Sequence, residues 1–328
     1  MELWDLADLC TPWCVHVAAT LRVAGHIEAG ISEIDKLAQA AGADAEALGR
    51  VMRHLVRKGL FEELEQGRFT LNEAACGLLN EGTLIGLDLE GFGGRMAHSW
   101  GTLLQAVKTG RPAYKDVFGK PFWEDLESHG EIAAQFDTLM GPAGHGIPDA
   151  QVLIDPADWD SVRTVVDVGG GTGSLLAEVL KARPGVRGIL VDQPATVERS
   201  APLFRKAGVE ARVTAVGQSF FEPLPAGGDL YLLKNVLADW PDAEASMILR
   251  RCAEAAQPSG RVVILGGISP GEAADPELLM LVLVGGKSRT LMEFRELAGK
   301  SGLTFQAAAR QPSGRFIVEC RAISSRSL

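Results

Sequence analysis

The first eighty residues carry apolar side chains at the three-to-four spacing of amphipathic helices. Residues 3–29 predict one or two such helices, and residues 32–58 predict a helix, a glycine turn and a second helix. Two short β-type runs, FEEL and RFTL, follow and are separated by Gln66-Gly67, as in a hairpin. This order of two helices and a hairpin is typical of a winged helix.

The next segment, residues 75–150, also has a largely helical pattern and ends near the break Gly141-Pro142. Aromatic residues are spread along it. Filling a core is the usual role of such side chains, and lining an apolar pocket is the alternative.

After Trp159 the pattern changes to short apolar runs that alternate with amphipathic segments. The apolar runs are RTVVDVGG, RGILVDQP, ARVTAVG, GDLYLLKNVL and GRVVILGG. Alternation of this kind predicts a mostly parallel, doubly wound, Rossmann-like α/β sheet. We therefore expect a winged-helix dimerisation domain at 1–80, a helical linker that covers the substrate at 81–155, and a Rossmann-like cofactor domain at 156–328.

A glycine-rich turn carries the strongest chemical signal. The run VVDVGGGTG at 165–173 is a buried strand that enters a turn and opens a helix near Ser174. Glycines let the backbone approach a cofactor closely, but the GxGxxG spacing of a dinucleotide site is incomplete because its sixth position is Ser174. Asp192 ends the next strand, where a carboxylate can accept hydrogen bonds from both ribose hydroxyls. Turn and acid together predict a nucleoside cofactor without a pyrophosphate.

Charge and hydropathy argue against two classes of partner. The net charge of -10 disfavours a phosphate backbone, although Arg50, Arg53, Arg57 and Lys58 on the second helix of the winged-helix pattern keep a DNA-binding regulator open. No apolar stretch approaches the roughly 20 residues that span a bilayer. We expect a cytoplasmic protein without nucleic-acid or membrane partners.

The cysteines and histidines give no sign of a metal centre in their spacing. Five cysteines occur without a CxxC pair, which suits reduced thiols. All six histidines precede residue 146, and none stands at ligand spacing from a Cys or Asp. We therefore expect no metal.

Several ordered motifs resemble one known family over nearly the whole chain. They are HVAATLRVAGHI, RHLVRKGLF, FWEDL at 122–126, FDTLM at 136–140, VVDVGGGTG, SFFEPLP, VLADWPD, ILRRCAEAA and GGKSRT. The chain is similar to S-adenosylmethionine-dependent O-methyltransferases with a winged-helix dimerisation domain, in particular the naphthoate and anthracycline O-methyltransferases of actinomycete natural-product pathways. The resemblance implies a homodimer that acts in antibiotic biosynthesis.

The resemblance also implies site residues. S-adenosylmethionine would be bound, and S-adenosylhomocysteine released, by Asp167, Gly169, Gly171, Gly173, Asp192, Gln193, Ser219, Phe220 and Lys234. Of these, Ser219 and Phe220 would border the adenine, and Lys234 would lie near the methionine carboxylate. A small aromatic substrate would lie against Trp123, Phe136, Met140 and Met280.

The catalytic positions depart from the family pattern. Many relatives have a His-Asp-Trp run where this chain has Ala238-Asp239-Trp240, so the general-base histidine is absent. Many also have GGKERT where this chain has Ser288, whereas Glu277 keeps the acidic position that would orient the histidine. No catalytic residue is certain. The candidate substitutes are Asp239, Glu277 and His145, with His98 as a further histidine.

These observations predict O-methylation of a hydroxyl on an aromatic, polyketide-type natural product. A general base contributes about 10² to 10⁴ in rate, so an acidic hydroxyl held in line with the methyl donor can react without one. One alternative is that the same fold uses the cofactor for hydroxylation, decarboxylation or rearrangement. A winged-helix regulator is a less favoured alternative.

Overall fold

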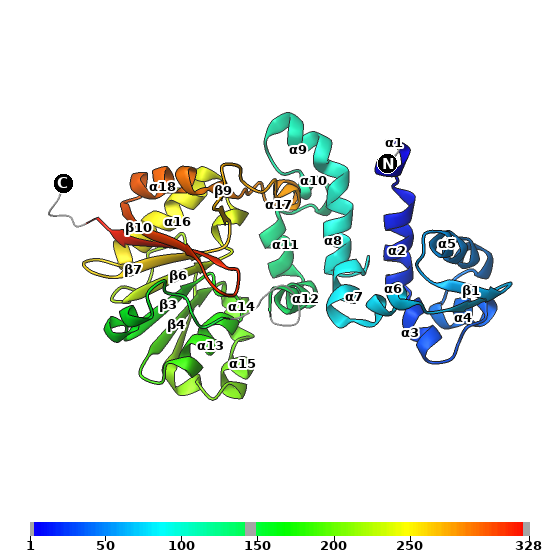
Figure 1. Cartoon of the computed structure of the whole chain (residues 1–328), viewed down its shortest axis with the longest axis horizontal. Coiled ribbons are helices and arrows are strands. Elements are labelled where there is room, and N and C mark those ends of the chain that lie inside the picture. The colour runs from blue at the N-terminus through cyan, green and yellow to red at the C-terminus, as the bar shows by residue number, and fades with distance from the viewer. Residues whose placement is uncertain (1–2, 142–148, 324–328) are drawn as a thin grey trace. The chain divides into compact units, whose positions relative to one another are not determined.

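The computed structural model describes residues 3–141 and 149–323, and it divides into two compact units (Figure 1). The first unit comprises Met1–Ser99 and Ser128–Gly146. The second comprises Trp100–Glu127 and Ile147–Leu328. The middle of the chain therefore contributes helices to both units, and each unit is described by itself.

The first unit begins with the predicted helices and hairpin. Their bounds are α1 (Leu3–Leu6), α2 (Cys10–Thr20), α3 (Val23–Glu28), α4 (Ile34–Ala41), α5 (Ala45–Arg57), β1 (Glu62–Glu65) and β2 (Arg68–Thr70). Asp44 caps α5, because its side chain accepts a hydrogen bond from the amide of Ala47 at 2.8 Å. Leu48, Met52 and Leu55 form the buried face of this helix. The two helices and the antiparallel hairpin occur in the order that the sequence predicts.

More helices complete this unit. They are α6 (Glu73–Cys76), η1 (Gly77–Leu79), α7 (Glu81–Leu87), α8 (Phe92–Ser99) and α12 (Gly130–Met140). Helix α12 packs against α7 and α8, where the rings of Phe92 and Phe136 lie 5.3 Å apart.

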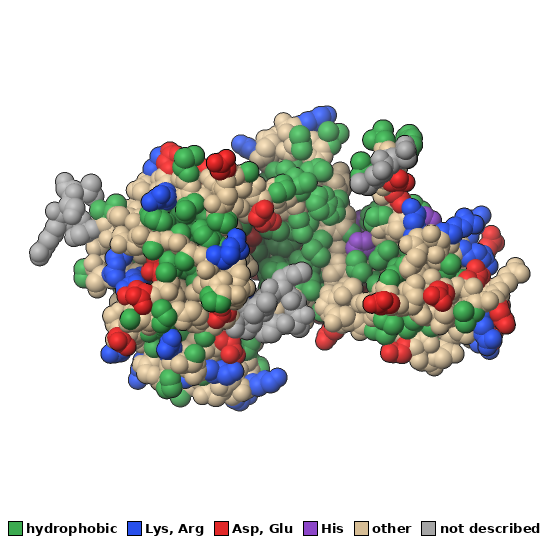
Figure 2. Space-filling model, in the orientation of Figure 1, with side chains coloured by type: hydrophobic (Ala, Val, Ile, Leu, Met, Phe, Trp, Pro, Cys, Tyr) green, Lys and Arg blue, Asp and Glu red, His purple; other side chains and the backbone are tan. Residues whose placement is uncertain are grey.

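Apolar side chains lie at the surface of the first helices (Figure 2). Trp4 is 82% exposed, and Leu3, Leu6 and Leu9 are also exposed. Large exposed apolar side chains that follow one another in this way are uncommon at the surface of a monomeric protein.

The second unit is built on a seven-stranded sheet with the order β10-β11-β7-β6-β3-β4-β5 (Figure 1). The strands are β3 (Thr164–Val168), β4 (Arg187–Asp192), β5 (Val213–Gly217), β6 (Leu230–Lys234), β7 (Arg261–Leu265), β10 (Leu303–Arg310) and β11 (Phe316–Ala322). The pairs from β5 to β7 are parallel, whereas β11 runs antiparallel to both β7 and β10. The predicted mostly parallel sheet is confirmed.

Helices cover both faces of this sheet, as Figure 1 shows. Val166 and Val168 pack toward α16 (Asp242–Ala255) and α18 (Leu291–Lys300). Val165 belongs to the opposite core, with residues of α13 (Ser174–Ala182), α14 (Pro194–Glu198) and α15 (Ala201–Lys206). Successive strand residues point to opposite faces, which explains why the strands read as continuous apolar runs.

Shorter elements complete the second unit. They are η2 (Trp100–Thr102), α9 (Leu103–Thr109), α10 (Tyr114–Phe118), α11 (Phe122–Ser128), η3 (Pro156–Ser161), η4 (Glu210–Arg212), η5 (Leu237–Asp239), β8 (Ile268–Ser269), α17 (Leu278–Leu283) and β9 (Arg289–Thr290). Helix α17 packs against α9 and η2. In the described part of the chain, no helix has the length and apolarity needed to cross a membrane.

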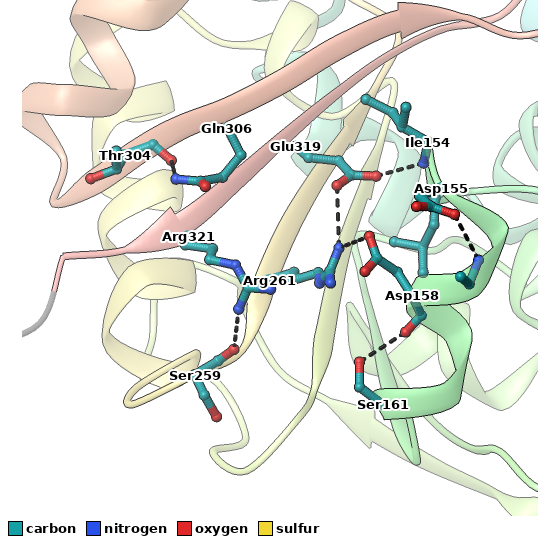
Figure 3. Close-up of polar contacts among 12 residues, drawn as sticks. Ile154, Asp155, Asp158, Ser161, Ser259, Arg261, Thr304, Gln306, Glu319 and Arg321 are labelled. Atoms are coloured by element: carbon teal, nitrogen blue, oxygen red, sulfur yellow. Dashed lines mark hydrogen bonds and ion pairs between the residues drawn. The ribbon is translucent and has the colours of Figure 1, made fainter.

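A polar pocket lies at the start of β7, away from the carboxyl ends of the parallel strands (Figure 3). Arg261 forms ion pairs there with Asp158 and with Glu319, the latter at 3.4 Å. Glu319 also accepts a hydrogen bond from the amide of Ile154 at 2.6 Å. The guanidinium of Arg261 lowers the pKa of Asp158. These contacts join the segment before β3 to the antiparallel end of the sheet, which is a structural role.

Candidate functional site

The glycine turn follows β3 and has a left-handed backbone at three of its residues. The φ angles are 67° at Gly169, 60° at Gly171 and 85° at Gly173. A Cβ at Gly169 would lie 2.8 Å from Val236, and one at Gly173 would collide with the ring of Phe204. A Cβ at Gly171 would meet nothing within 4 Å, so the turn is open there. Only glycine satisfies both the backbone angles and the close packing.

Asp192 lies in direct contact with this turn. Its Oδ2 accepts a hydrogen bond from the amide of Gly171 at 2.7 Å, and its Oδ1 accepts one from the amide of Gln193 at 2.7 Å. The side chain stays partly exposed at the end of β4, and a carboxylate oxygen can accept more than one hydrogen bond. The turn and the acid that the sequence singled out are therefore parts of one site.

Asp167 and Lys234 form a second pair of ionisable groups in this region. Asp167 is fully buried in β3, and neither of its carboxylate oxygens has a hydrogen-bond partner among the described residues. Burial raises the pKa of Asp167 to about 7, whereas the charge of Lys234 acts to lower it. Lys234 ends β6, and burial lowers its pKa. Its ammonium has no hydrogen bond or ion pair to any described residue, as expected of a group that binds a ligand carboxylate.

Aromatic side chains surround the turn. The ring of Phe220 lies 3.4 Å from the position that a Cβ of Gly169 would occupy. Ser219 precedes it and accepts a hydrogen bond at Oγ from the amide of Phe221 at 3.2 Å. The ring of Trp240 lies 5.9 Å from Phe220 and stacks on Trp123 at 6.4 Å and 20°. The fold thus places a predicted pocket residue, Trp123, against Trp240, and the Trp240 ring in turn packs on Phe220, which borders the glycine turn.

This arrangement fits S-adenosylmethionine. The open face of the turn at Gly171 accepts a ligand close to the backbone, and Asp192 stands where a ribose would bind. Lys234 offers a cation for a carboxylate, and Phe220 offers an apolar face for a base. The set lies at the carboxyl ends of β3, β4 and β6, where open α/β sheets bind ligands.

The short helix η5 carries the position of the absent histidine. Ala238 is buried there, and a Cβ on Gly267 would lie 2.9 Å from the Ala238 methyl group. A Cβ on Gly286 would collide with the Ala238 carbonyl. Burial, together with the charge of Glu277, raises the pKa of the neighbouring Asp239 to about 8. Asp239 is therefore mostly protonated at neutral pH and is a weak candidate for a base.

Arg289 holds this part of the site, and the sequence reasoning did not identify it. Its side chain is 1% exposed and donates to the carbonyls of Leu237 and Trp240, at 2.8 Å each. It also pairs with Asp242 at 2.9 Å. The planar guanidinium thus fixes the backbone on both sides of Ala238 and Asp239. The one signal in the sequence was its place in the GGKSRT motif.

Glu277 and Ser288, the other two positions at which the family resemblance implies catalytic groups, contact each other. Ser288 donates from Oγ to Oε1 of Glu277 at 3.1 Å. Glu277 has a positive φ of 44° and is the N-cap residue that precedes α17, the helix that carries Met280. Holding a non-glycine residue in this conformation costs energy, which is a feature of functional sites.

The remaining predicted residues that the structure describes belong to the first unit. Phe136 and Met140 are on α12, and Met140 is 39% exposed. His98 lies in the same unit, where its ring is 5.1 Å from that of Trp13. His145 lies outside the described residues. Within the second unit, the structure brings together the predicted cofactor residues, Trp123, Asp239 and Glu277.

The sequence profile of the O-methyltransferase domain family matches residues 100–304. That match spans more than half of the chain and includes the glycine turn, Asp192, Lys234 and Arg289. The chain belongs to the O-methyltransferase family. Members of this family depend on S-adenosylmethionine.

Two characterised relatives of this O-methyltransferase-family chain come from Streptomyces. It is 42% identical over 308 residues to a 2,7-dihydroxy-5-methyl-1-naphthoate 7-O-methyltransferase of Streptomyces carzinostaticus, and the match covers 92% of each chain. It is 38% identical over 324 residues to the aclacinomycin 10-hydroxylase RdmB of Streptomyces purpurascens, covering 95% of this chain and 86% of the relative.

A solved structure resembles the whole chain. It is the O-methyltransferase NcsB1 from neocarzinostatin biosynthesis, in complex with S-adenosylmethionine and 2-hydroxy-5-methyl naphthoic acid. The TM-score is 0.90 at 41% identity, and the match covers 98% of this chain and 99% of that one.

Proposed function

We propose that this O-methyltransferase-family protein transfers the methyl group of S-adenosylmethionine to a hydroxyl of a planar aromatic natural product. The observation that carries the proposal is the contact of Asp192 with the amide of Gly171 at the open face of the glycine turn. The relative that methylates a dihydroxynaphthoate supports the reaction and the class of acceptor.

The cofactor residues have separate tasks in this proposal. Asp192 accepts the ribose hydroxyls, and Gln193 continues the strand end beside it. Lys234 neutralises the carboxylate, and the buried Asp167 lies beneath the turn, where a Cβ on Gly170 would meet its carboxyl group. Gly169, Gly171 and Gly173 provide the turn, and Ser219 and Phe220 border the adenine. When bound, S-adenosylmethionine supplies an electrophilic methyl group on a sulfonium.

The acceptor would lie against apolar side chains. In the second unit these are Trp123, which stacks on Trp240, and Met280 on α17. The family resemblance also implies Phe136 and Met140, which lie on α12 of the first unit. Rigid aromatic side chains orient a planar acceptor, and orientation in line with the methyl group lowers the barrier without a base.

The absence of the histidine at Ala238 makes orientation the main catalytic contribution. Arg289 fixes the backbone of η5, so the site is rigid where the base would stand. The neighbouring Asp239 is protonated at neutral pH, because its pKa is raised to about 8. An acceptor hydroxyl with a low pKa then reacts as its own oxyanion.

The test is turnover of the purified protein with S-adenosylmethionine and a series of hydroxynaphthoates and hydroxyanthraquinones, followed by mass spectrometry. We expect products heavier by one CH₂ group and one equivalent of S-adenosylhomocysteine. Binding of S-adenosylhomocysteine without any methylated product across acidic acceptors would contradict the reaction. No binding at all would contradict the cofactor assignment.

A second candidate function is hydroxylation in the same site. Ala238 stands where the histidine base would be, and a relative of 38% identity is named a 10-hydroxylase. Such a reaction would add one oxygen atom to the acceptor and would require an oxidant and a reductant. The mass of the product therefore separates the two functions.

We also propose that residues 1–80, which belong to the first unit, are a winged-helix dimerisation domain. Its helices α4 and α5 and its hairpin support the winged-helix assignment, and the exposed Leu3, Trp4, Leu6 and Leu9 support burial against a second copy. Analytical ultracentrifugation at micromolar concentration should give a dimer. The substitution Trp4→Glu should give a monomer, whereas Leu64→Glu, at an exposed leucine of β1, should not.

A further inference from the structure

A cluster of three metal-binding side chains lies in the first unit, outside the site described above. Cys10 and Cys14 are four residues apart on α2, and His54 lies near the end of α5. The ligand atoms of these three residues lie within 4.8 Å of one another. The spacing of these residues in the sequence did not reveal the cluster, because the fold brings Cys14 close to His54, which lies 40 positions later.

The two sulfur atoms already stand at the separation that zinc requires. The distance between Sγ of Cys10 and Sγ of Cys14 is 3.8 Å. In a tetrahedral site with Zn–S bonds of about 2.3 Å, two sulfur ligands lie about 3.8 Å apart. A disulfide needs a separation of about 2.05 Å, which two consecutive turns of a continuous helix do not provide without rearrangement.

The hydrogen bonds around His54 leave one ring nitrogen ready to bind a metal. Thr11 donates from Oγ1 to Oδ2 of Asp8 at 2.6 Å, so its oxygen accepts from Nε2 of His54 at 2.8 Å. This hydrogen bond uses Nε2 of His54, so Nδ1 is the ring nitrogen that can bind a metal. A carboxylate or hydroxyl that fixes the second nitrogen of a histidine is the usual outer support of a metal ligand.

Asp8 is itself held in place. It accepts hydrogen bonds from the amides of Cys10 and Thr11 at 2.9 and 3.1 Å, and from Lys58 at 2.9 Å. This series of hydrogen bonds, from Lys58 through Asp8 and Thr11, thus orients the imidazole of His54 before a metal binds. Cys10 is the first residue of the 11-residue helix α2, and Cys14 lies one turn further along the same helix.

We propose that Cys10, Cys14 and His54 bind Zn²⁺, with water as the fourth ligand. Two thiolates neutralise the ion, and the site joins the start of α2 to the end of α5. The proposal is independent of the methyl-transfer function, because all three ligands belong to the first unit and the cofactor residues belong to the second.

The experiment uses the full chain, reduced and freed of metal with a chelator. Zn²⁺ is added in competition with a chromophoric chelator, and Co²⁺ is added to a second sample for its absorption spectrum. We expect one equivalent of tightly bound Zn²⁺ and a thiolate-to-cobalt charge-transfer band. The variant Cys10→Ser, at an exposed position, should lose at least about 100-fold in affinity, and Thr11→Ala should lose about 10- to 100-fold.

Cys76→Ser is the matched control, because Cys76 is also an exposed free cysteine of the first unit. It should retain full affinity, and both cysteine variants should keep the affinity of the native chain for S-adenosylhomocysteine. Zinc binding that Cys10→Ser leaves unchanged would overturn the proposal. A cobalt spectrum without a thiolate band, or a Cys10–Cys14 disulfide in the protein under ambient conditions, would also overturn it.

Discussion

Ser288 donates a hydrogen bond from Oγ to Oε1 of Glu277 over 3.1 Å. Both residues stand at positions where the family resemblance implies catalytic groups, and the third such position is Ala238. The carboxylate that would orient a histidine is thus held by a serine hydroxyl instead. This relationship explains how an acidic residue remains in the site although the base that it would serve is absent.

Restoring the histidine tests this interpretation. We expect Ala238→His to raise kcat for weakly acidic phenols by up to about 10² to 10⁴ and to change kcat little for acidic hydroxyls, which ionise without help. Steady-state kinetics with acceptors of graded acidity measures this. Since Ala238 packs closely against Gly267, the fold of the variant is checked by circular dichroism. An equal gain for every acceptor would contradict the account.

Asp239 provides a test through pH. Burial and the charge of Glu277 raise its pKa to about 8, so it is mostly protonated at neutral pH and ionises as the pH rises through 8. If orientation alone drives the reaction, the pH profile of kcat/KM follows the pKa of the acceptor hydroxyl, and Asp239→Asn keeps that profile. If Asp239 is the base, the native profile rises toward a plateau above pH 8 for every acceptor, and Asp239→Asn abolishes the rise.

Asp192 should determine cofactor affinity. Asp192→Asn replaces a carboxylate that binds two backbone amides and, in our proposal, the ribose. We expect about 10- to 100-fold weaker binding of S-adenosylhomocysteine in calorimetric titration, as for the loss of a hydrogen bond to a charged group. Asp229→Asn is the control, because Asp229 also accepts from two backbone amides, those of Arg163 and Thr164. The Asp229→Asn variant should be less stable than the native chain but should bind S-adenosylhomocysteine with unchanged affinity.

Asp167 should make stability depend on pH. Its pKa is raised from 3.8 to about 7 by burial, so the folded state binds more protons than the unfolded state between these values. The free energy of unfolding therefore falls as pH rises from 4 to 7, by about 4 kcal/mol at most. Asp167→Asn lacks this group, so its stability relative to the native chain should increase over the same range. Urea unfolding at several pH values measures the free energy of unfolding of both proteins. A difference between the native chain and Asp167→Asn that stays constant with pH would contradict the prediction.

Arg289 should be a major source of local stability. Arg289→Met leaves the carbonyls of Leu237 and Trp240 buried without their donor, and we expect a loss of about 3 kcal/mol in the free energy of unfolding. Lys287→Met removes an exposed ion pair to the same Asp242 and should cost less than about 1 kcal/mol. Urea denaturation compares the two variants. Equal losses would show that the buried contacts of Arg289 do not matter.

The sheet and the cofactor turn were predictable because their signals are local. Each parallel strand is a continuous apolar run in the sequence. The turn is marked by glycines, which favour the left-handed backbone that it needs. Asp192 was predictable because an acid at the end of the next strand lies at the same edge of the sheet.

The rest of the site depends on contacts between distant segments. Nothing near Arg289 in the sequence reveals that its guanidinium reaches the carbonyls of residues about 50 positions earlier. The stacking of Trp123 on Trp240 likewise depends on the fold, which assigns residues 100–127 to the second unit. The pairing of Cys10 and Cys14 with His54 escaped the search for metal-ligand spacing for the same reason.

The most direct measurement of the central claim is the mass of the product formed from a hydroxynaphthoate and S-adenosylmethionine by the native chain, which has Ala238 in place of a base. The account predicts a gain of one CH₂ group, with stoichiometric S-adenosylhomocysteine and the highest rate for the most acidic hydroxyl. A gain of one oxygen atom, or an unchanged acceptor in the presence of bound cofactor, would contradict it.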